Sequence, residues 1–258
     1  MLRYERYGQG PLLVLAHGSP GNARSWKAVG ERLAGRFDIV ALNLPGYEGA
    51  TPPDPVPPTE TASIAAEVEM LIASLDAPVT LAAHSFGGNV ALRVAMRQQV
   101  PLERLVLFEP VVVNILPIAG KHEDYRALKD VFDGYIVQSA RGEPFAVRTM
   151  VDFWFGAGAF DAMPEPVQAY LRLWSAKNVA EVQAGFRETF TQEELAGVTI
   201  PVDVACGTRS PEVTAEMART VAGFVASGRY HSLDGTDHNI LATHPDVVAA
   251  LIDEAAQA

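Results

Sequence analysis

The sequence predicts an α/β protein in which a mostly parallel sheet lies between layers of helices. Short apolar runs alternate with longer stretches whose apolar residues recur at helical spacing. The apolar runs are continuous rather than alternating, which is typical of parallel strands buried on both faces. The chain has 258 residues, 48% of them hydrophobic, and is long enough to build one large core.

Six of the runs are the expected strands. Five are strongly apolar and one near the end is weaker; they are residues 12–16, 38–42, 79–83, 105–108, 202–206 and 229–233. Amphipathic patterns between the strands predict helices at 25–34, 60–74, 89–99 and 245–256. The proline-rich segment 51–58 is expected to be a surface loop, because proline is excluded from helix interiors and central strands.

Residues 111–196 break this alternation, because helical patterns follow one another there without a convincing strand. The helices expected in this stretch are 125–137, 147–155, 167–177 and 179–190. Sites in α/β sheets lie outside the carboxyl ends of the strands, so a helical insert placed there would enclose the site. We therefore predict a core of residues 1–110 and 197–258, and a helical cap of residues 111–196 inserted before the penultimate core strand.

The composition excludes several classes of partner. The formal net charge of −11 repels phosphate backbones and anionic lipid, so neither nucleic acid nor a membrane surface is expected. The single cysteine, Cys206, excludes an intrachain disulfide, and its apolar surroundings predict a buried, inert thiol. The N-terminal residues hold no apolar signal core, which predicts a cytoplasmic protein. The sequence leaves the oligomeric state open.

The most informative segment is residues 83–88 (AHSFGG), which joins an apolar strand to a helix. A nucleophilic serine at such a sharp turn is raised above the sheet, and the residues two positions to either side must be small. Those positions around Ser85 hold Ala83 and Gly87. The alternative is an ordinary glycine-rich turn before a helix, but the strand–turn–helix order favours a nucleophile elbow.

A second segment, residues 17–21 (HGSPG), follows the first apolar strand. Acyl transfer needs two backbone N–H groups aimed at the oxygen on which negative charge develops. We expect the N–H groups of Ser19 and Phe86 to form this oxyanion hole. His17 is expected to brace the loop rather than to take part in catalysis.

A third segment, residues 235–238 (GTDH), brings a histidine to a loop late in the chain. The order serine, acid, histidine is the one that this kind of fold uses. His238 is therefore the expected base. The other histidines outside the HGSPG loop are expected to be structural or solvated: His84, His122, His231 and His244.

Together these segments resemble the α/β-hydrolase superfamily, and the resemblance covers nearly the whole chain. The turn at 43–47 (NLPGY) belongs to the same pattern. Three further runs are similar to small bacterial serine hydrolases with a helical cap: 108–110 (FEP), 152–156 (DFWFG) and 243–245 (THP). The resemblance implies a mostly parallel, eight-stranded sheet with helices on both faces. It also implies hydrolytic chemistry without a metal or an organic cofactor.

The acid of the triad departs from this pattern. In most members it follows the strand that here ends at Cys206, and the corresponding position holds Ser210. A hydroxyl cannot stabilise an imidazolium as a carboxylate does. We expect Glu109, at the end of the preceding strand, to be the acid, although it could instead brace the turn before Pro110. Four other acidic residues stay as alternatives: Asp234, Asp237, Glu212 and Asp203.

The expected function is a serine hydrolase that acts on a small-molecule carboxylic ester or related acyl substrate (lactone, thioester or amide) through an acyl-enzyme. Ser85 is the nucleophile, His238 the base and Glu109 the residue that orients it. Carbon–carbon bond hydrolysis or perhydrolysis could use the same residues. A non-catalytic ligand-binding protein on a retired hydrolase fold is the remaining alternative, and Ser210 is its one supporting feature.

Four aromatic residues of the predicted cap are candidates for an apolar substrate pocket: Phe153, Trp154, Phe155 and Phe160. Aromatic side chains at this spacing also fit a simple hydrophobic core.

Overall fold

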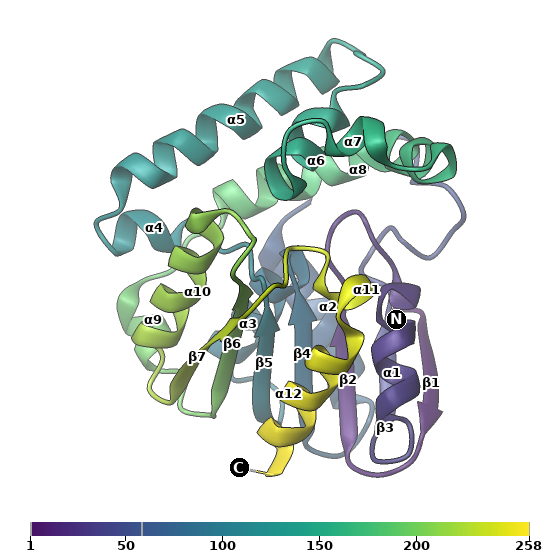
Figure 1. Ribbon diagram of the computed structural model, residues 1–258. Coiled ribbons are helices and arrows are strands. Elements are labelled where there is room, and N and C mark those ends of the chain that lie inside the picture. Colours follow the sequence, from purple (N-terminus) through teal and green to yellow (C-terminus); the bar gives the residue numbers. More distant parts are fainter. Residues whose placement is uncertain (1, 58, 258) are drawn as a thin grey trace.

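The chain folds around one twisted sheet that is covered by helices, as the computed structural model in Figure 1 shows for residues 2–57 and 59–257. The strand order is β1-β3-β2-β4-β5-β6-β7. The strands are β1 (Tyr4–Gly8), β2 (Leu12–Ala16), β3 (Asp38–Leu42), β4 (Val79–His84), β5 (Leu102–Phe108), β6 (Val202–Gly207) and β7 (Gly228–Leu233). β1 runs antiparallel to β3, and the other neighbouring pairs are parallel.

The seven strands of the described residues are one fewer than the eight that the resemblance implied. β1 lies at the edge of the sheet, and most of its side chains are exposed. Its exposed residues include the charged Glu5 and Arg6. Charged side chains on an edge strand oppose the addition of a further strand, so the sheet ends at β1 in this part of the molecule.

Helices cover both faces of the sheet, which explains why the strands are continuous apolar runs. Consecutive residues of one strand, such as Leu13 and Val14 in β2, point to opposite faces of the sheet and belong to two different hydrophobic clusters. One cluster includes α2 (Thr61–Ala73), α3 (Phe86–Arg97) and α10 (Glu212–Phe224). The other includes the short helices η1 (Ala23–Trp26) and α11 (Ile240–Thr243), with α1 (Lys27–Leu33) and α12 (Pro245–Gln257).

Six helices lie between β5 and β6 in the sequence: α4 (Ile115–Ile118), α5 (His122–Ala140), α6 (Val147–Phe155), α7 (Ala159–Ala162), α8 (Glu165–Arg187) and α9 (Gln192–Ala196). α5 to α8 lie together above the carboxyl ends of the strands (Figure 1). α4 and α9 contact α10 and thus flank the core. This insert therefore stands over the edge of the sheet at which sites of α/β proteins form.

The predicted strands at 12–16 and 38–42 are confirmed to the residue, and the other four differ only at their ends. The helices predicted at 167–177 and 179–190 form a single helix, α8, because neither glycine nor proline interrupts residues 167–184. No described helix is both long and apolar enough to cross a membrane.

Candidate active site

Ser85 lies at a strained turn between β4 and α3. Its backbone has φ 54° and ψ −123°, a conformation that residues other than glycine rarely adopt and that functional sites often hold. Gly87 makes this turn possible, because a Cβ there would lie 2.4 Å from the carbonyl oxygen of His17. The residue two positions after the serine must therefore be small, because the loop 17–21 packs directly against it.

His238 contacts Ser85 from the loop that joins β7 to α11. The distance between His238 Nε2 and Ser85 Oγ is 3.1 Å, within reach of proton transfer. Two contacts hold this loop in place. His84 Nε2 donates to the carbonyl oxygen of His238 at 2.9 Å. Gly207 lets the loop approach β6, because a Cβ there would lie 2.3 Å from the carbonyl oxygen of Thr236.

Glu109 supplies a carboxylate to the other side of the imidazole. It is the first residue after β5, its side chain is fully buried, and its Oε2 lies 3.3 Å from His238 Nδ1. Glu109 Oε1 accepts from the N–H of Gly207 at 2.6 Å and from the hydroxyl of Ser210 at 2.8 Å. The serine at the expected acid position thus donates to the same carboxylate that contacts His238.

These contacts keep Glu109 ionised. Burial alone would raise its pKa. The hydrogen bond and the charge of His238, together with the hydrogen bonds from Gly207 and Ser210, outweigh burial and lower the pKa below the ordinary value for glutamate.

The four alternative acids have other hydrogen-bond partners: Asp234 accepts from Thr208, Asp237 from the N–H of Asn239, Glu212 from Arg219, and Asp203 from Arg104, Arg229 and His231.

The loop 17–21 is pressed against the Ser85 turn. A Cβ on Gly18 would lie 2.9 Å from Ser85 Cβ, so only glycine allows this approach. His17 braces the loop: its Nε2 accepts from the N–H of Leu44 at 3.0 Å, and its Nδ1–H donates to the carbonyl oxygen of Gly18 at 2.7 Å. Burial lowers the pKa of His17 to about 4, so the imidazole is neutral.

The predicted oxyanion-hole residues, Ser19 and Phe86, both line a pocket beside Ser85. Phe86 is the first residue of α3, where backbone N–H groups have no partner within the helix. No hydrogen bond among the described residues uses the N–H of Ser19 or Phe86. Both amides are therefore available to an oxygen of a ligand.

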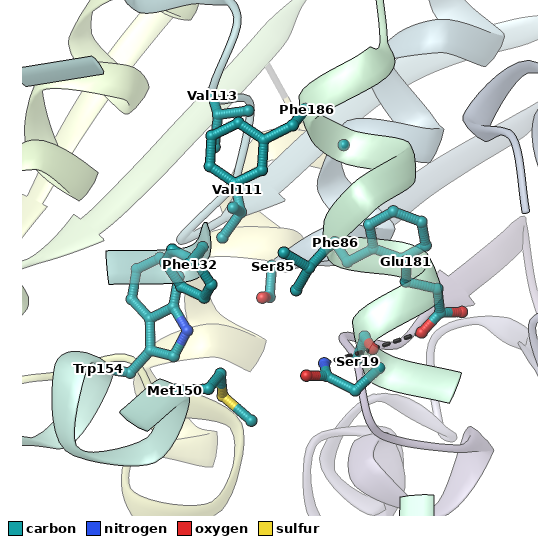
Figure 2. A pocket seen from close by; sticks show the side chains of 13 residues that line it. Ser19, Ser85, Phe86, Val111, Val113, Phe132, Met150, Trp154, Glu181 and Phe186 are labelled. Atoms are coloured by element: carbon teal, nitrogen blue, oxygen red, sulfur yellow. Dashed lines mark hydrogen bonds between the residues drawn. The ribbon is translucent and has the colours of Figure 1, made fainter. Parts of the chain in front are cut away.

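Two pockets meet at Ser85. The first, here the apolar pocket, has an empty volume of about 470 Å³ and extends between α5, α6 and α8. Its hydrophobic walls include Val111, Val113, Phe132, Met150, Val182 and Phe186. Figure 2 shows Ser85 between Phe132 and Trp154 on one side and Glu181 and Ser19 on the other. The second, here the histidine-side pocket, has an empty volume of about 1050 Å³ and is also lined by His84 and His238.

Two of the four aromatic candidates reach these pockets. Trp154 lines both, and its ring is stacked on His238 with the centroids 4.4 Å apart and the planes at 12°. Phe155 lines the histidine-side pocket. Phe153 and Phe160 line neither of the two: Phe153 packs edge-on against Phe132, and Phe160 is fully buried against Phe145. Neighbouring residues of a helix point in different directions, so only part of the run faces the site.

The sequence reasoning missed a buried polar cluster on α8. Lys177, Asn178 and Glu181 are each at most 2% exposed, and Glu181 and Asn178 line the apolar pocket. Lys177 and Glu181 are four residues apart, a spacing that is common for pairs on exposed helix faces. Nothing in the sequence separates this buried pair from an exposed one. Residues 2–57 and 59–257 hold no group of three or more His, Cys, Asp or Glu side chains arranged to bind a metal ion.

A mostly parallel sheet covered by helices, with a serine, a histidine and a glutamate in contact at its carboxyl ends, has the architecture of an α/β hydrolase. The chain belongs to the alpha/beta hydrolase family, whose model matches residues 13–251.

The relatives differ in how much of the chain they match. The chain is 34% identical to an uncharacterized protein of Mycobacterium tuberculosis over 101 residues, 39% of this chain and 29% of that protein. It therefore spans less than a third of that relative. It is 25% identical to the 2-succinyl-6-hydroxy-2,4-cyclohexadiene-1-carboxylate synthase of Salmonella arizonae, over 96% of this chain and 93% of the synthase. Among solved structures, the enol-lactonase from Burkholderia xenovorans has a TM-score of 0.77 with 20% identity, covering 100% of this chain and 96% of that one, which shows the shared fold.

Proposed function

We propose that the chain is a serine hydrolase that cleaves a small carboxylic ester or a related acyl compound through an acyl-enzyme. The observation that carries this proposal is the row of contacts from Ser85 Oγ to His238 Nε2, and from His238 Nδ1 to Glu109 Oε2. A hydroxyl in contact with an imidazole whose far nitrogen faces a carboxylate is the arrangement that activates serine for attack on a carbonyl.

In the proposed reaction, Ser85 Oγ attacks the carbonyl carbon while its proton passes to His238 Nε2. Glu109 orients the imidazole and stabilises the imidazolium. The N–H groups of Ser19 and Phe86 hold the negative oxygen of the tetrahedral intermediate. When the intermediate collapses, the leaving alcohol takes the proton from Nε2. A water molecule then attacks the acyl-enzyme while its proton passes to His238 Nε2, and this proton returns to Ser85 Oγ as the carboxylic acid leaves.

We propose that the insert acts as a cap over this site. The boundaries predicted from the sequence, 111–196, also include α4 and α9, which pack on α10 of the core. The proposed cap is therefore the set of helices α5 to α8, which supply Phe132, Met150, Trp154 and Phe186 to the apolar pocket. Side chains at this place would exclude water from the acyl group while the carbonyl is attacked.

The pockets favour an acyl group without charge. Neither the apolar pocket nor the histidine-side pocket is lined by a lysine or an arginine of the described residues. The one acidic side chain that faces the apolar pocket is that of Glu181. A carboxylate carried by the acyl group would therefore be buried without a cation in the pocket wall to pair with it. The Salmonella relative makes a carboxylate, by its name. We propose that the present chain acts on a different, uncharged acyl compound.

Hydrolysis of two matched esters tests this function. We expect steady turnover of ethyl hexanoate, lost in His238→Ala. Monoethyl adipate has an acyl group of the same length with a terminal carboxylate, and we expect its kcat/KM to be at least about a hundredfold lower, since an unpaired buried charge costs several kcal/mol. Equal rates for the two esters would contradict the uncharged substrate class. Tight binding of esters without turnover would contradict hydrolysis itself.

The ester assay separates hydrolysis from ligand binding without turnover, and a panel of the other substrate classes separates the related reactions. Lactones, thioesters, amides, carbon–carbon bonds and peroxyacids need the same groups at Ser85. A ligand-binding protein on a retired fold was favoured by the missing acid at Ser210, and the contact of Glu109 with His238 removes that support.

A further inference from the structure

A buried polar cluster links α8 to the loop 17–21. Glu181 Oε1 accepts from the ammonium group of Lys177 at 2.7 Å. Glu181 Oε2 accepts from the hydroxyl of Tyr47 at 2.6 Å and from the hydroxyl of Ser19. The side chains of Lys177 and Glu181 are 2% and 0% exposed. The charges of the pair are thus withdrawn from water, and the carboxylate is shared among three donors.

The Ser19 hydroxyl is held from two directions by residues of α8. It donates to Glu181, as a dashed line in Figure 2 shows, and it accepts from Asn178 Nδ2 at 2.8 Å. Asn178 is itself fixed, because its Oδ1 accepts from the hydroxyl of Tyr135 at 2.9 Å. A serine side chain has one rotatable bond before its oxygen, so these contacts also fix the backbone of Ser19.

The Lys177 end of the ion pair between Lys177 and Glu181 is enclosed by aromatic rings and by backbone. The Lys177 ammonium lies over the ring of Tyr47, 5.2 Å from its centroid, and Tyr47 is stacked on Trp174 at 4.8 Å. The Lys177 side chain also packs on Gly46, where a Cβ would lie 2.7 Å from Lys177 Cε. Removal of these charges from water costs several kcal/mol per ion, and apolar residues of similar volume often stabilise a fold as well or better. Stability alone therefore gives no reason for this pair at this place.

We infer that Glu181 is a positioning residue, which holds Ser19 and with it the Ser19 N–H of the proposed oxyanion hole, and that Lys177 keeps Glu181 in place. This inference rests on the proposed function. Because Glu181, Asn178 and Lys177 all belong to α8, the oxyanion donor is aligned only while α8 is seated on the core. Catalysis is in this way coupled to the placement of the proposed cap.

The test compares Glu181→Gln with the wild type on an ester and on its thionoester, in which the carbonyl oxygen is replaced by sulfur. Glutamine has the same shape, but its NH₂ group cannot accept from Ser19 or Tyr47. A thiolate intermediate gains little from the oxyanion donors. We expect Glu181→Gln to lower kcat for the ester about tenfold to a hundredfold with little change in KM, somewhat less than the loss of a whole donor. The ratio of ester to thionoester rates falls by the same factor.

Two further variants keep the test decisive. Glu188→Gln is the matched control, because it removes a buried ion pair to Arg93 at the end of α8 without a contact to Ser19; we expect it to leave the rate ratio unchanged. Ser19→Ala removes the hydroxyl but leaves the Lys177–Glu181 pair, and we expect it to lower the ratio as Glu181→Gln does. If Glu181→Gln does not fold, Ser19→Ala carries the test.

Wild-type rate ratios in both Glu181→Gln and Ser19→Ala would overturn the inference while leaving the proposed function intact. If the wild type shows no ester turnover, or if its turnover persists in Ser85→Ala, the proposed function is overturned, and this inference with it.

Discussion

Ser85 and Glu109 occupy equivalent positions at the ends of two neighbouring parallel strands. They follow His84 and Phe108, which are partners in the register of β4 and β5, and the N–H of Ser85 donates to the carbonyl oxygen of Phe108 at 3.1 Å. Both residues have positive φ, 54° and 50°. The sheet thus lifts a hydroxyl and a carboxylate side by side, and His238 lies between them in contact with both.

Replacement of Glu109 tests the position of the acid. We expect Glu109→Gln to lower kcat about a thousandfold to ten-thousandfold, because an amide cannot stabilise the imidazolium. Ser210→Asp in the Glu109→Gln background places a carboxylate at the position where the resemblance led us to expect the acid, and we expect it to recover at least about tenfold of the lost rate. Steady-state kinetics on a short ester measure both effects. Full activity of Glu109→Gln, with loss in Asp234→Asn or Asp237→Asn, would assign the acid elsewhere.

Trp154 tests the packing of the imidazole. Its ring is stacked on His238 and lines both pockets, so Trp154→Ala removes one wall and frees the imidazole to rotate. We expect kcat/KM to fall about tenfold or more, since misplacement of a catalytic group by about 1 Å can cost a hundredfold. Phe153→Leu is the control, because Phe153 lines neither pocket. Equal activity of the two variants would leave the stacking without a catalytic role.

Gly18 tests the approach of the loop 17–21 to the elbow. A Cβ at this position would lie 2.9 Å from Ser85 Cβ and from His84 Nδ1, so Gly18→Ala must displace the loop that carries the Ser19 N–H. We expect kcat to fall about a hundredfold, similar to the loss of an oxyanion donor. Gly35→Ala is a matched control, because a Cβ on Gly35 meets nothing within 4 Å. A fully active Gly18→Ala would show that the donor does not depend on this contact.

Two histidines, the buried His17 and the part-buried His84, predict how stability depends on pH. Burial lowers the pKa of His17 to about 4 and that of His84 to about 3, from 6.5. Between pH 6.5 and about 4, both side chains stay largely neutral in the folded state, whereas each takes up a proton in the unfolded chain. Their contribution to the free energy of unfolding is therefore complete above pH 6.5, and each loses up to about 1.4 kcal/mol per pH unit as the pH falls toward about 4.

Urea unfolding at pH 6.5, 5.5 and 4.5 measures this slope. His84→Gln removes one of the two groups, and we expect it to flatten the slope relative to the wild type. His122→Gln, at an exposed position, serves as the control and leaves the slope unchanged. Identical slopes in all three proteins would mean that His84 takes up its proton equally in the folded and unfolded states.

The parts of the fold that follow from buried, local patterns could be predicted. The strand from Leu12 to Ala16 is apolar throughout because helices cover both of its faces, and its bounds are confirmed. The small residue two positions after Ser85 could also be predicted, because the loop 17–21 packs against Gly87 and leaves no space for a side chain there. The contact between Glu109 and His238 followed from the expectation that neighbouring strands end at one edge of the sheet.

The remaining features depend on packing between distant segments. β1 was not predicted, because Tyr4–Gly8 is an exposed edge strand without an apolar run. α10 was not predicted either, although Glu212–Phe224 has one buried face. The burial of Lys177 and Glu181 is set by Tyr47 and Ser19, more than 120 residues away in the sequence. No pattern within α8 indicates these partners.

Labelling with a fluorophosphonate probe tests whether Ser85 is an activated nucleophile, because the probe forms a covalent adduct only with such a group. We predict one adduct per chain, located by mass spectrometry on the peptide that contains Ser85, absent from Ser85→Ala and formed much more slowly in His238→Ala. Equal labelling of the wild type and Ser85→Ala, or an adduct on another residue, would contradict it.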